Sequence, residues 1–333
     1  MVKKRTYKTS KPKEDKKSFA EEVAERLIAA LEAGVAPWQK SWSAGEKNHV
    51  LPFNVASGNR YRGINVLMLM AQGYSDARWM TFKQAVDKGY SVRKGEKGTR
   101  VQFWSSIGSA VKTDEGGNPV VDDKGKPVKE KITLDSPFVR YAYVFNAQQI
   151  EGIPALEVKE PEAPGVWDQS ERADAIIAAS NAKIFHDGGD QAYYMTLRDS
   201  IHMPLKELFP DAASYYEVLL HELGHWSGHP SRLKRDMSGS FGTESYAKEE
   251  LRAEIASMLI GEALDLGHNP ESHASYVGSW IKVLKNEPLE IFRAAADAEK
   301  ILNFILAFDP ALKKDVDTPS VEREEESELE MSL

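Results

Sequence analysis

The sequence predicts an α+β fold divided between two domains. The chain has 333 residues, a length typical of two domains, and 41% of them are apolar, which is enough to build two cores. Helical and alternating apolar patterns both occur along it. The charge is also divided: residues 1–150 hold 26 Lys and Arg against 16 Asp and Glu, whereas residues 151–333 hold 17 against 35. We therefore expect a basic N-terminal module and an acidic C-terminal module with different partners.

The ends of the chain and one internal segment mark the expected boundaries. Residues 1–17 are rich in lysine and residues 311–333 in glutamate, so we expect a disordered basic arm and a disordered acidic tail. Residues 158–168 combine prolines with charged side chains and are interpreted as a linker. These boundaries leave one domain over residues 18–157 and a second over residues 169–310.

The composition excludes several classes of protein. The chain has no cysteine, which rules out disulfides and thiolate zinc sites and is compatible with a reducing compartment. No apolar run approaches the ~20 residues that span a bilayer. The lysine-rich start lacks the apolar core of a secretory signal. We expect a cytoplasmic protein without a membrane partner.

The first domain mixes helices with strands. A helix is expected over residues 18–33, with glutamates in its first turn, and another begins after Thr81 as its N-cap. Strands are expected at Thr99–Trp104 and Phe138–Asn146. The Gly-, Asp- and Lys-rich stretch Asp114–Lys131 between them reads as a long, exposed hairpin insertion.

The second domain is expected to be mainly helical. Residues 169–181, 272–284 and 289–306 have helical apolar periodicity. Tyr193–Met203 alternates apolar and polar residues, as an edge strand does, and leads into the most informative helix of the chain.

That helix carries the sequence His221-Glu222-Leu223-Gly224-His225. Asp211 is a plausible N-cap for it. Residues four apart share a helix face, so the imidazoles of His221 and His225 can reach one metal ion. Glu222 stands beside the first ligand, where its carboxylate can act as general base on a water molecule. The alternative is a chance match on an ordinary amphipathic helix.

A zinc site of this kind needs a third protein ligand. Residues 246–257 form a second expected helix, on which Glu250 and Glu254 share a face, so that one can bind zinc and the other can orient a ligand histidine. The segment resembles the Glu-x-x-Ala-Asp sequence of zinc peptidases whose third ligand is a glutamate. That resemblance implies Glu250 as the ligand and Glu254 as the supporting acid, with Glu249 solvated. The residues alone leave the choice between Glu250 and Glu254 open. His229 precedes a proline and is interpreted as a loop residue.

The basic module combines cations with aromatic residues, a composition that suits single-stranded nucleic acid, because every base offers a face for stacking and cations follow the phosphates. An ordinary solvated surface is the alternative. Trp38, Trp42, Trp79 and Trp104 are each expected to be buried or half-buried. The expected DNA contacts are Arg60, Arg62, Lys83, Arg93, Lys94, Lys97 and Arg100.

Several segments occur in one order from about Ser18 to Pro310 and together give the chain a family resemblance. They are Pro37–Trp42, Tyr61–Asn65, Trp79–Gln84, Val92–Thr99, Val144–Gln149, His221–His229, Ser231–Leu233 and Tyr246–Glu254. The chain is similar to the antirestriction proteins of the ArdC type on conjugative plasmids, which are related to TraC-type plasmid primases. The resemblance implies an N-terminal single-stranded-DNA-binding domain joined to a C-terminal zincin-like metallopeptidase domain that together protect incoming DNA from host restriction.

The expected chemistry is zinc-dependent peptide hydrolysis. His221, His225 and Glu250 would hold Zn²⁺, Glu222 would be the general base, and a host restriction enzyme or another protein would be the substrate. Two alternatives remain. One is a non-catalytic DNA-binding or DNA-mimicking protein with a structural zinc site, in keeping with the acidic second half. The other is a primase-related protein, although the sequence has no obvious cluster of paired acids for two-metal nucleotidyl transfer.

Overall fold

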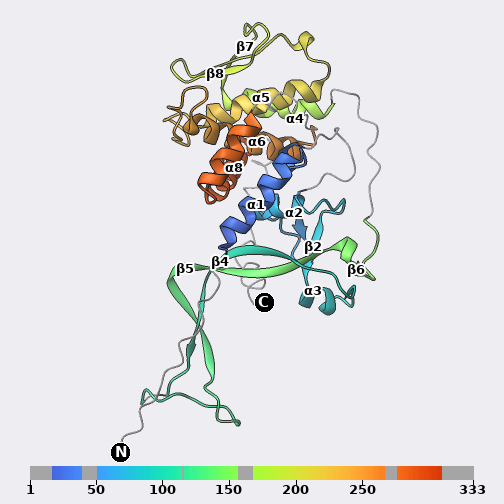
Figure 1. Cartoon of the computed structure of the whole chain (residues 1–333), viewed down its shortest axis with the longest axis vertical. Coiled ribbons are helices and arrows are strands. Elements are labelled where there is room, and N and C mark those ends of the chain that lie inside the picture. The colour runs from blue at the N-terminus through green and yellow to red at the C-terminus, as the bar shows by residue number, and fades with distance from the viewer. Residues whose placement is uncertain (1–16, 40–50, 115, 157–167, 267–275, 310–333) are drawn as a thin grey trace, which may run out of the picture. The chain divides into compact units, whose positions relative to one another are not determined.

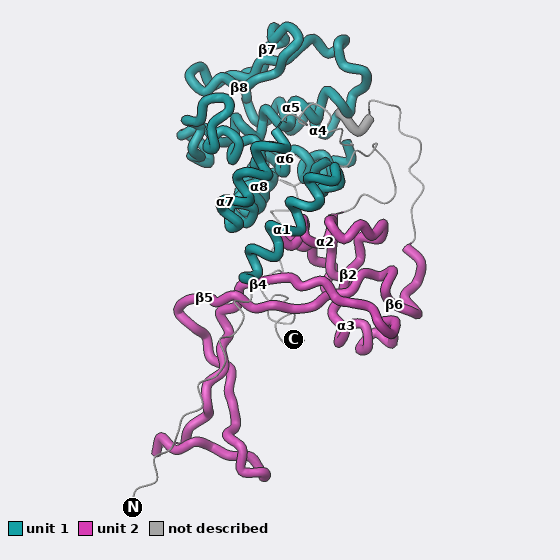
Figure 2. The backbone as a smooth tube through the Cα atoms, viewed as in Figure 1, with its two compact units in different colours: residues 1–45, 164–309 teal, residues 46–163, 310–333 magenta. Residues whose placement is uncertain are grey.

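The computed structural model describes residues 17–39, 51–114, 116–156, 168–266 and 276–309. It contains two compact units, each mixing helices with strands, which confirms the α+β class (Figure 2). Unit 1 comprises residues 1–45 and 164–309, and unit 2 comprises residues 46–163 and 310–333. Apart from Lys17 and Asp168, the expected basic arm, linker and acidic tail lie outside the described residues. None of the described helices is long and apolar enough to cross a membrane.

Unit 2 is built on a four-stranded sheet in the order β1-β2-β5-β4. β1 and β2 are parallel and the other pairs are antiparallel. Two short strands, β3 and β6, pair separately. The elements of the unit are β1 (Phe53–Asn54), α2 (Ile64–Met70), β2 (Arg78–Thr81), α3 (Phe82–Asp87), β3 (Ser91–Val92), β4 (Thr99–Val111), β5 (Lys129–Asn146), the 3-10 turn η2 (Ala147–Gln149) and β6 (Ile150–Glu151).

The two faces of this sheet are covered differently. On one face, Leu69 from α2 packs with Trp79, Val101 and Val144 in a buried cluster. On the other face, Met80 lies in a second cluster with residues of α3 and β6. The expected cap of α3 is confirmed, because the Thr81 side chain accepts a hydrogen bond from the Gln84 amide in a capping box.

β4 and β5 continue past the sheet as a two-stranded arm (Figure 1). Both strands are longer than expected, since pairing resumes after an irregularity between Ser105 and Ile107 and runs on to Val111 and Lys129. The connection at the end of the arm is mostly exposed, as expected for an insertion.

Unit 1 is mainly helical, and its long central helix α6 packs against α5, α7 and α8. A small sheet in the order β7-β9-β8 lies beside α5 (Figure 1). The elements of the unit are α1 (Phe19–Glu32), η1 (Pro37–Gln39), α4 (Asp168–Ser180), β7 (Lys183–Phe185), β8 (Tyr193–Met195), β9 (Ser200–His202), η3 (Lys206–Leu208), α5 (Ala212–Ser227), α6 (Glu244–Leu264), α7 (Val277–Asn286) and α8 (Glu290–Leu306).

The first helix lies in unit 1, whereas the sequence places it in the expected domain over residues 18–157. α1 packs along α7, the Phe19 ring stands 6.0 Å from that of Phe292, and Glu32 pairs with Lys285 at 3.2 Å. The apolar periodicity of the helix shows that one face is buried but not which part of the chain covers it. Each compact unit therefore combines two separate stretches of the chain, and no single boundary along the sequence divides them.

The expectation of a single edge strand over Tyr193–Met203 is wrong. The segment forms two antiparallel strands, β8 and β9, joined by a turn in which Asp199 has a φ of +48°. The Asp199 carboxylate accepts a 2.8 Å hydrogen bond from the Tyr194 hydroxyl and pairs with the guanidinium of Arg232. The turn is stabilised by an arginine that lies more than thirty residues further along the chain. The alternating pattern of residues 193–203 alone could therefore not reveal the turn.

Candidate metal centre

The centre begins on α5, which presents two histidines to α6. The helix is capped as expected, because the Asp211 carboxylate accepts a 2.7 Å hydrogen bond from the Ser214 amide. His221 and His225 follow one turn apart and are both buried. Gly224 lies between them against α6, where an added Cβ would stand 3.4 Å from the Cα of Ala253. A methyl group fits at this distance, but a larger side chain would separate the two helices at the level of the imidazoles.

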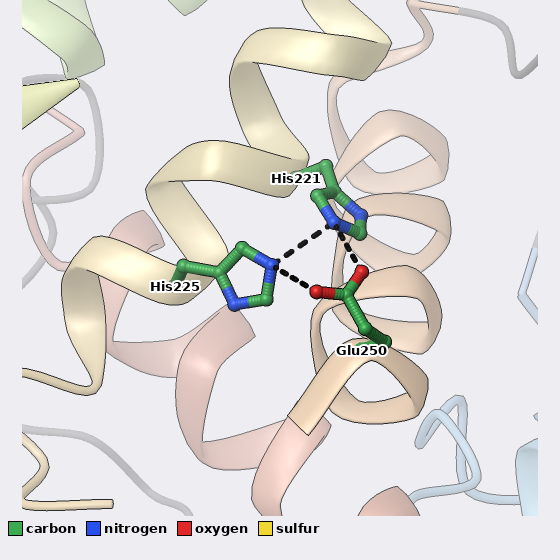
Figure 3. A group of neighbouring side chains, drawn as sticks. All are labelled: His221, His225 and Glu250. Carbon is green, nitrogen blue, oxygen red and sulfur yellow. Dashed lines mark hydrogen bonds and ion pairs between the residues drawn. The ribbon is translucent and has the colours of Figure 1, made fainter. Parts of the chain in front are cut away.

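α6 supplies a carboxylate that faces both imidazoles (Figure 3). The Nε2 atoms of His221 and His225 lie 3.1 Å apart, and each lies 3.4 Å from an oxygen of Glu250. Tetrahedral bonds of about 2.0–2.1 Å to one ion set neighbouring ligand atoms about 3.3 Å apart. The three side chains thus match three corners of one divalent-metal site, and of the two candidate glutamates it is Glu250 that completes the triangle.

The other nitrogen of each imidazole faces a second carboxylate of α6. His221 Nδ1 lies 3.4 Å from Glu254 Oε2, and His225 Nδ1 lies 3.2 Å from Glu249 Oε1. Such a partner fixes the orientation of a ligand imidazole and increases its basicity. The expectation that Glu249 is solvated is wrong: only 7% of the residue is exposed, because the loop after α5 covers it.

Arg235 in that loop holds Glu249 in place. Its Nη2 lies 2.7 Å and its Nε 3.0 Å from the two oxygens of Glu249. The same guanidinium donates to the Ser227 hydroxyl at 2.8 Å and to the Gly224 carbonyl at 2.6 Å. Sequence reasoning missed Arg235, because a residue ten positions after His225 in an irregular loop carries no spacing signal.

The electrostatics of the centre follow from burial and close opposite charges. Burial by itself raises the pKa of Glu249, but hydrogen bonds from His225 and Arg235 outweigh it and hold this pKa below its usual value. Burial lowers the pKa of His225, whereas Glu250 and Glu249 raise it more strongly, to about 9. A metal ion at this centre competes with protons, so its affinity increases with pH.

A cavity of about 810 Å³ opens beside the centre. It is lined by the three candidate ligands, by Glu222 and by the β8 residues Tyr193 and Tyr194. Tyr246 and Tyr276 also line it, and their hydroxyl oxygens lie 3.2 Å apart. Burial raises the pKa of the Tyr276 hydroxyl, which therefore keeps its proton at neutral pH.

Two other groups of polar side chains lie away from the centre. Ser200 Oγ, His202 and Asp187 are hydrogen-bonded in the order of a hydrolytic triad, at 3.0 and 2.7 Å. Ser200 is only 2% exposed, whereas the Asp187 side chain is 61% exposed. A hydrolytic triad requires the reverse, an accessible nucleophile and a buried acid. We therefore interpret these hydrogen bonds as stabilising the small sheet. His229 bonds to Ser231 in the loop after α5, as expected for a loop residue.

The expected DNA contacts all lie in unit 2, but on different elements. Arg62, Lys83, Arg93, Lys94 and Lys97 are exposed, whereas Arg60 and Arg100 are half-buried. The expectation that Trp38 and Trp79 are buried is confirmed. The same expectation for Trp104 is wrong, since 65% of it is exposed, and Trp42 lies outside the described residues.

Both halves of the chain match known protein families. Residues 17–145 match the N-terminal domain of the anti-restriction factor ArdC, and residues 171–297 match a zincin-like metallopeptidase family. The first match includes α1, although that helix packs in unit 1.

Two curated relatives are DNA primases TraC of Escherichia coli, 56% and 57% identical over 89% of this chain. The aligned part is 20% and 28% of those proteins, so the chain spans about a quarter of their length.

Crystal structures of the antirestriction protein ArdC from plasmid R388 extend the likeness to the whole fold. The metal-free form has a TM-score of 0.67 at 36% identity, and the Mn(II)-bound form has 0.68 at 34%. Each match covers 88% of this chain and 98% of the R388 protein. The chain therefore belongs to the ArdC antirestriction family, with an ArdC N-terminal domain followed by a zincin-like metallopeptidase domain.

Proposed function

We propose that unit 1 is a zinc-dependent peptidase in which His221, His225 and Glu250 hold the ion. The observation that carries the proposal is the triangle of two imidazole nitrogens and a carboxylate, with edges of 3.1, 3.4 and 3.4 Å, at the wall of a cavity. Two imidazoles and one carboxylate suit Zn²⁺ and leave a position open. The ion, when bound, would act as a Lewis acid that polarises the scissile carbonyl and an attacking water.

Glu222 is the proposed general base. It precedes Leu223 on the ligand helix and lines the cavity beside His221. Its carboxylate would take a proton from the attacking water and pass it to the nitrogen of the leaving amine. Glu254 and Glu249 would hold the two imidazoles in the orientation that the structure records.

The walls of the cavity would bind and orient the peptide. β8 pairs with β9 on one side, and its residues Tyr193 and Tyr194 line the cavity. An extended peptide could add to β8 by main-chain hydrogen bonds. The hydroxyls of Tyr246 and Tyr276 lie on the same cavity, where a proton-bearing hydroxyl can donate to the oxygen that becomes negative during attack.

We further propose that unit 2 binds single-stranded DNA, and that the two activities together protect incoming DNA from restriction. Residues 51–156 hold 15 Lys and Arg against 10 Asp and Glu, so this segment is basic although the whole chain is acidic. Cations on its surface would follow the phosphates. The expected contacts named above supply these cations, and exposed aromatic side chains in the same unit would stack with bases.

A substitution of the general base tests the peptidase. Glu222→Gln should retain zinc, measured by metal analysis of the purified protein, and should lose hydrolysis of a denatured casein substrate that the wild-type protein cleaves. His225→Ala should lose zinc, whereas His229→Ala, four residues further on, should retain both zinc and hydrolysis because His229 lies outside the centre. Hydrolysis retained by Glu222→Gln would refute the assignment.

A cellular assay separates proteolysis from DNA mimicry by an acidic protein. Conjugative transfer of unmodified DNA into a restricting host measures protection directly. If proteolysis is required, Glu222→Gln abolishes protection at unchanged protein level. Full protection by this variant would favour the non-catalytic alternative, in which the metal stabilises the fold only.

A further inference from the structure

An exposed row of aromatic side chains lies on one face of the β4–β5 pair. Trp104 is 65% exposed, Tyr141 49% and Tyr143 58%. With Arg100 these residues form what we call the aromatic face. In soluble proteins such a row of large, exposed rings is uncommon outside binding surfaces.

The strand register places these side chains on the same side of the sheet. Arg100 is paired with Tyr143, and Trp104 with Val139, two residues before Tyr141. Because directly paired residues share a face, as do residues two apart along a strand, all four side chains point the same way. Successive rings along the row are therefore about 7 Å apart. The Arg100 guanidinium lies over the Tyr141 ring, 5.1 Å from its centroid.

On the side of the aromatic face, a second cluster, of Met80 with Phe145 packed against it, covers the sheet next to β2, and the opposite side carries the first cluster. Val101, Ala142 and Val144 point there and belong to the buried cluster with Leu69 and Trp79. The three rings of the row belong to neither cluster and are exposed. The strand register places Trp104 on the side away from the Leu69 cluster, which explains why the expectation that it is buried or half-buried failed.

The charge around the aromatic face favours a polyanion. No Asp or Glu occurs from Lys97 to Val111 or from Ser136 to Ile150, the segments that form this part of the sheet. Arg100 lies within the row and Lys97 is exposed just before β4. Adjacent rings select a partner whose flat groups are accessible, and bases are accessible in a single strand but are stacked and paired in a duplex.

We propose that the aromatic face is the platform on which single-stranded DNA lies, with bases stacked on Trp104, Tyr141 and Tyr143 and the backbone beside Arg100 and Lys97. This inference rests on the proposed single-strand binding of unit 2 and assigns it to one surface. It adds three aromatic residues that the cation-based expectation did not include.

The test uses the full-length protein and a fluorescein-labelled oligo(dT), with anisotropy read at several salt concentrations. Trp104→Ala and Tyr141→Ala should each weaken binding roughly 5- to 150-fold, and Trp104→Phe should restore most of the loss because a phenyl ring still stacks. These changes should leave the salt dependence unaltered. Arg100→Gln should instead reduce the slope of log K against log salt by about 0.7.

Phe138→Ala is the matched control. Phe138 is 41% exposed and lies on β5 three residues before Tyr141, so it points to the opposite face. It should bind the oligonucleotide like the wild-type protein. Circular dichroism melting checks that every variant is folded.

The outcomes separate this inference from the proposed function on which it rests. Wild-type protein that binds oligo(dT), together with aromatic variants that bind equally well, would overturn the aromatic face while leaving single-strand binding intact. Wild-type protein that does not bind would overturn both. A third outcome is that the aromatic variants bind oligo(dT) like the wild-type protein but sediment differently because self-association is lost. That result would identify the aromatic face as a contact between copies of this chain and would also overturn the proposal.

Discussion

Replacing Arg235 by methionine should lower both the stability of unit 1 and its affinity for a metal ion. The guanidinium is 8% exposed and makes two contacts with Glu249, at 2.7 and 3.0 Å, besides those with Ser227 and Gly224. Its loss removes one of the two partners of the buried Glu249 carboxylate and leaves the His225 imidazole as the other. Breaking a buried ion pair on one side costs about 3–5 kcal/mol.

The effect on the metal follows from the same contact. Arg235 is one of the two groups that lower the pKa of the buried Glu249, so its loss raises that pKa and frees a carboxylate that is otherwise held beside His225 Nδ1. Loss of such a supporting partner typically reduces metal affinity about 10- to 100-fold. We therefore expect a weaker zinc complex even under conditions where the variant is fully folded.

Urea unfolding of the metal-free protein and zinc titration against a competing chelator measure the two effects separately. The double variant Arg235→Met with Glu249→Met removes both charges and should recover most of the stability but not the zinc affinity. Lys285→Met is the surface control, because its side chain is 58% exposed, that of its partner Glu32 is 53% exposed, and such a pair should contribute less than about 1 kcal/mol. An Arg235→Met protein with wild-type stability and zinc affinity would refute the reasoning.

Three further changes test other contacts of unit 1. Gly224→Ala should be tolerated, since its Cβ would stand at ordinary contact distance from Ala253, whereas Gly224→Leu should force α5 and α6 apart and lower zinc affinity, as a chelator titration would show. Tyr276→Phe should retain zinc and reduce casein turnover about 100-fold if its hydroxyl stabilises the oxyanion; unchanged turnover would exclude that role. Burial and the charge of Asp265 raise the pKa of Glu262 from 4.5 to about 8. The stability that protonated Glu262 contributes to the folded protein is fully present below pH 4.5. It is lost as pH rises through 8, at up to about 1.4 kcal/mol per pH unit. Glu262→Gln should remove this dependence in urea unfolding at pH 5–9, and parallel pH profiles for the two proteins would contradict it.

Local patterns were predictable wherever the stabilising contact lies within a few residues. The caps at Thr81 and Asp211 depend on hydrogen bonds three residues along the chain, and both helices begin where expected. The spacing of His221 and His225 on one helix depends only on its pitch, so the metal-ligand pair was also readable from sequence.

Contacts between distant segments were not predictable in this way. The glutamates of α6 repeat on one helix face, but only the packing of α5 on α6 sets Glu250 before both Nε2 atoms and Glu254 beside Nδ1 of His221. Glu249 was misjudged because a loop residue, Arg235, covers and pairs with it.

The sequence by itself determined the α+β class, the position of the metal helix and the basic character of the first half, because these depend on composition and short-range periodicity. The tertiary structure decided that α1 packs in unit 1, that Trp104 is exposed and that Arg235 supports the centre. The physical reason is common to all three: an apolar stripe or a charged residue reveals that it needs a partner, but only the folded chain brings that partner or leaves the surface open.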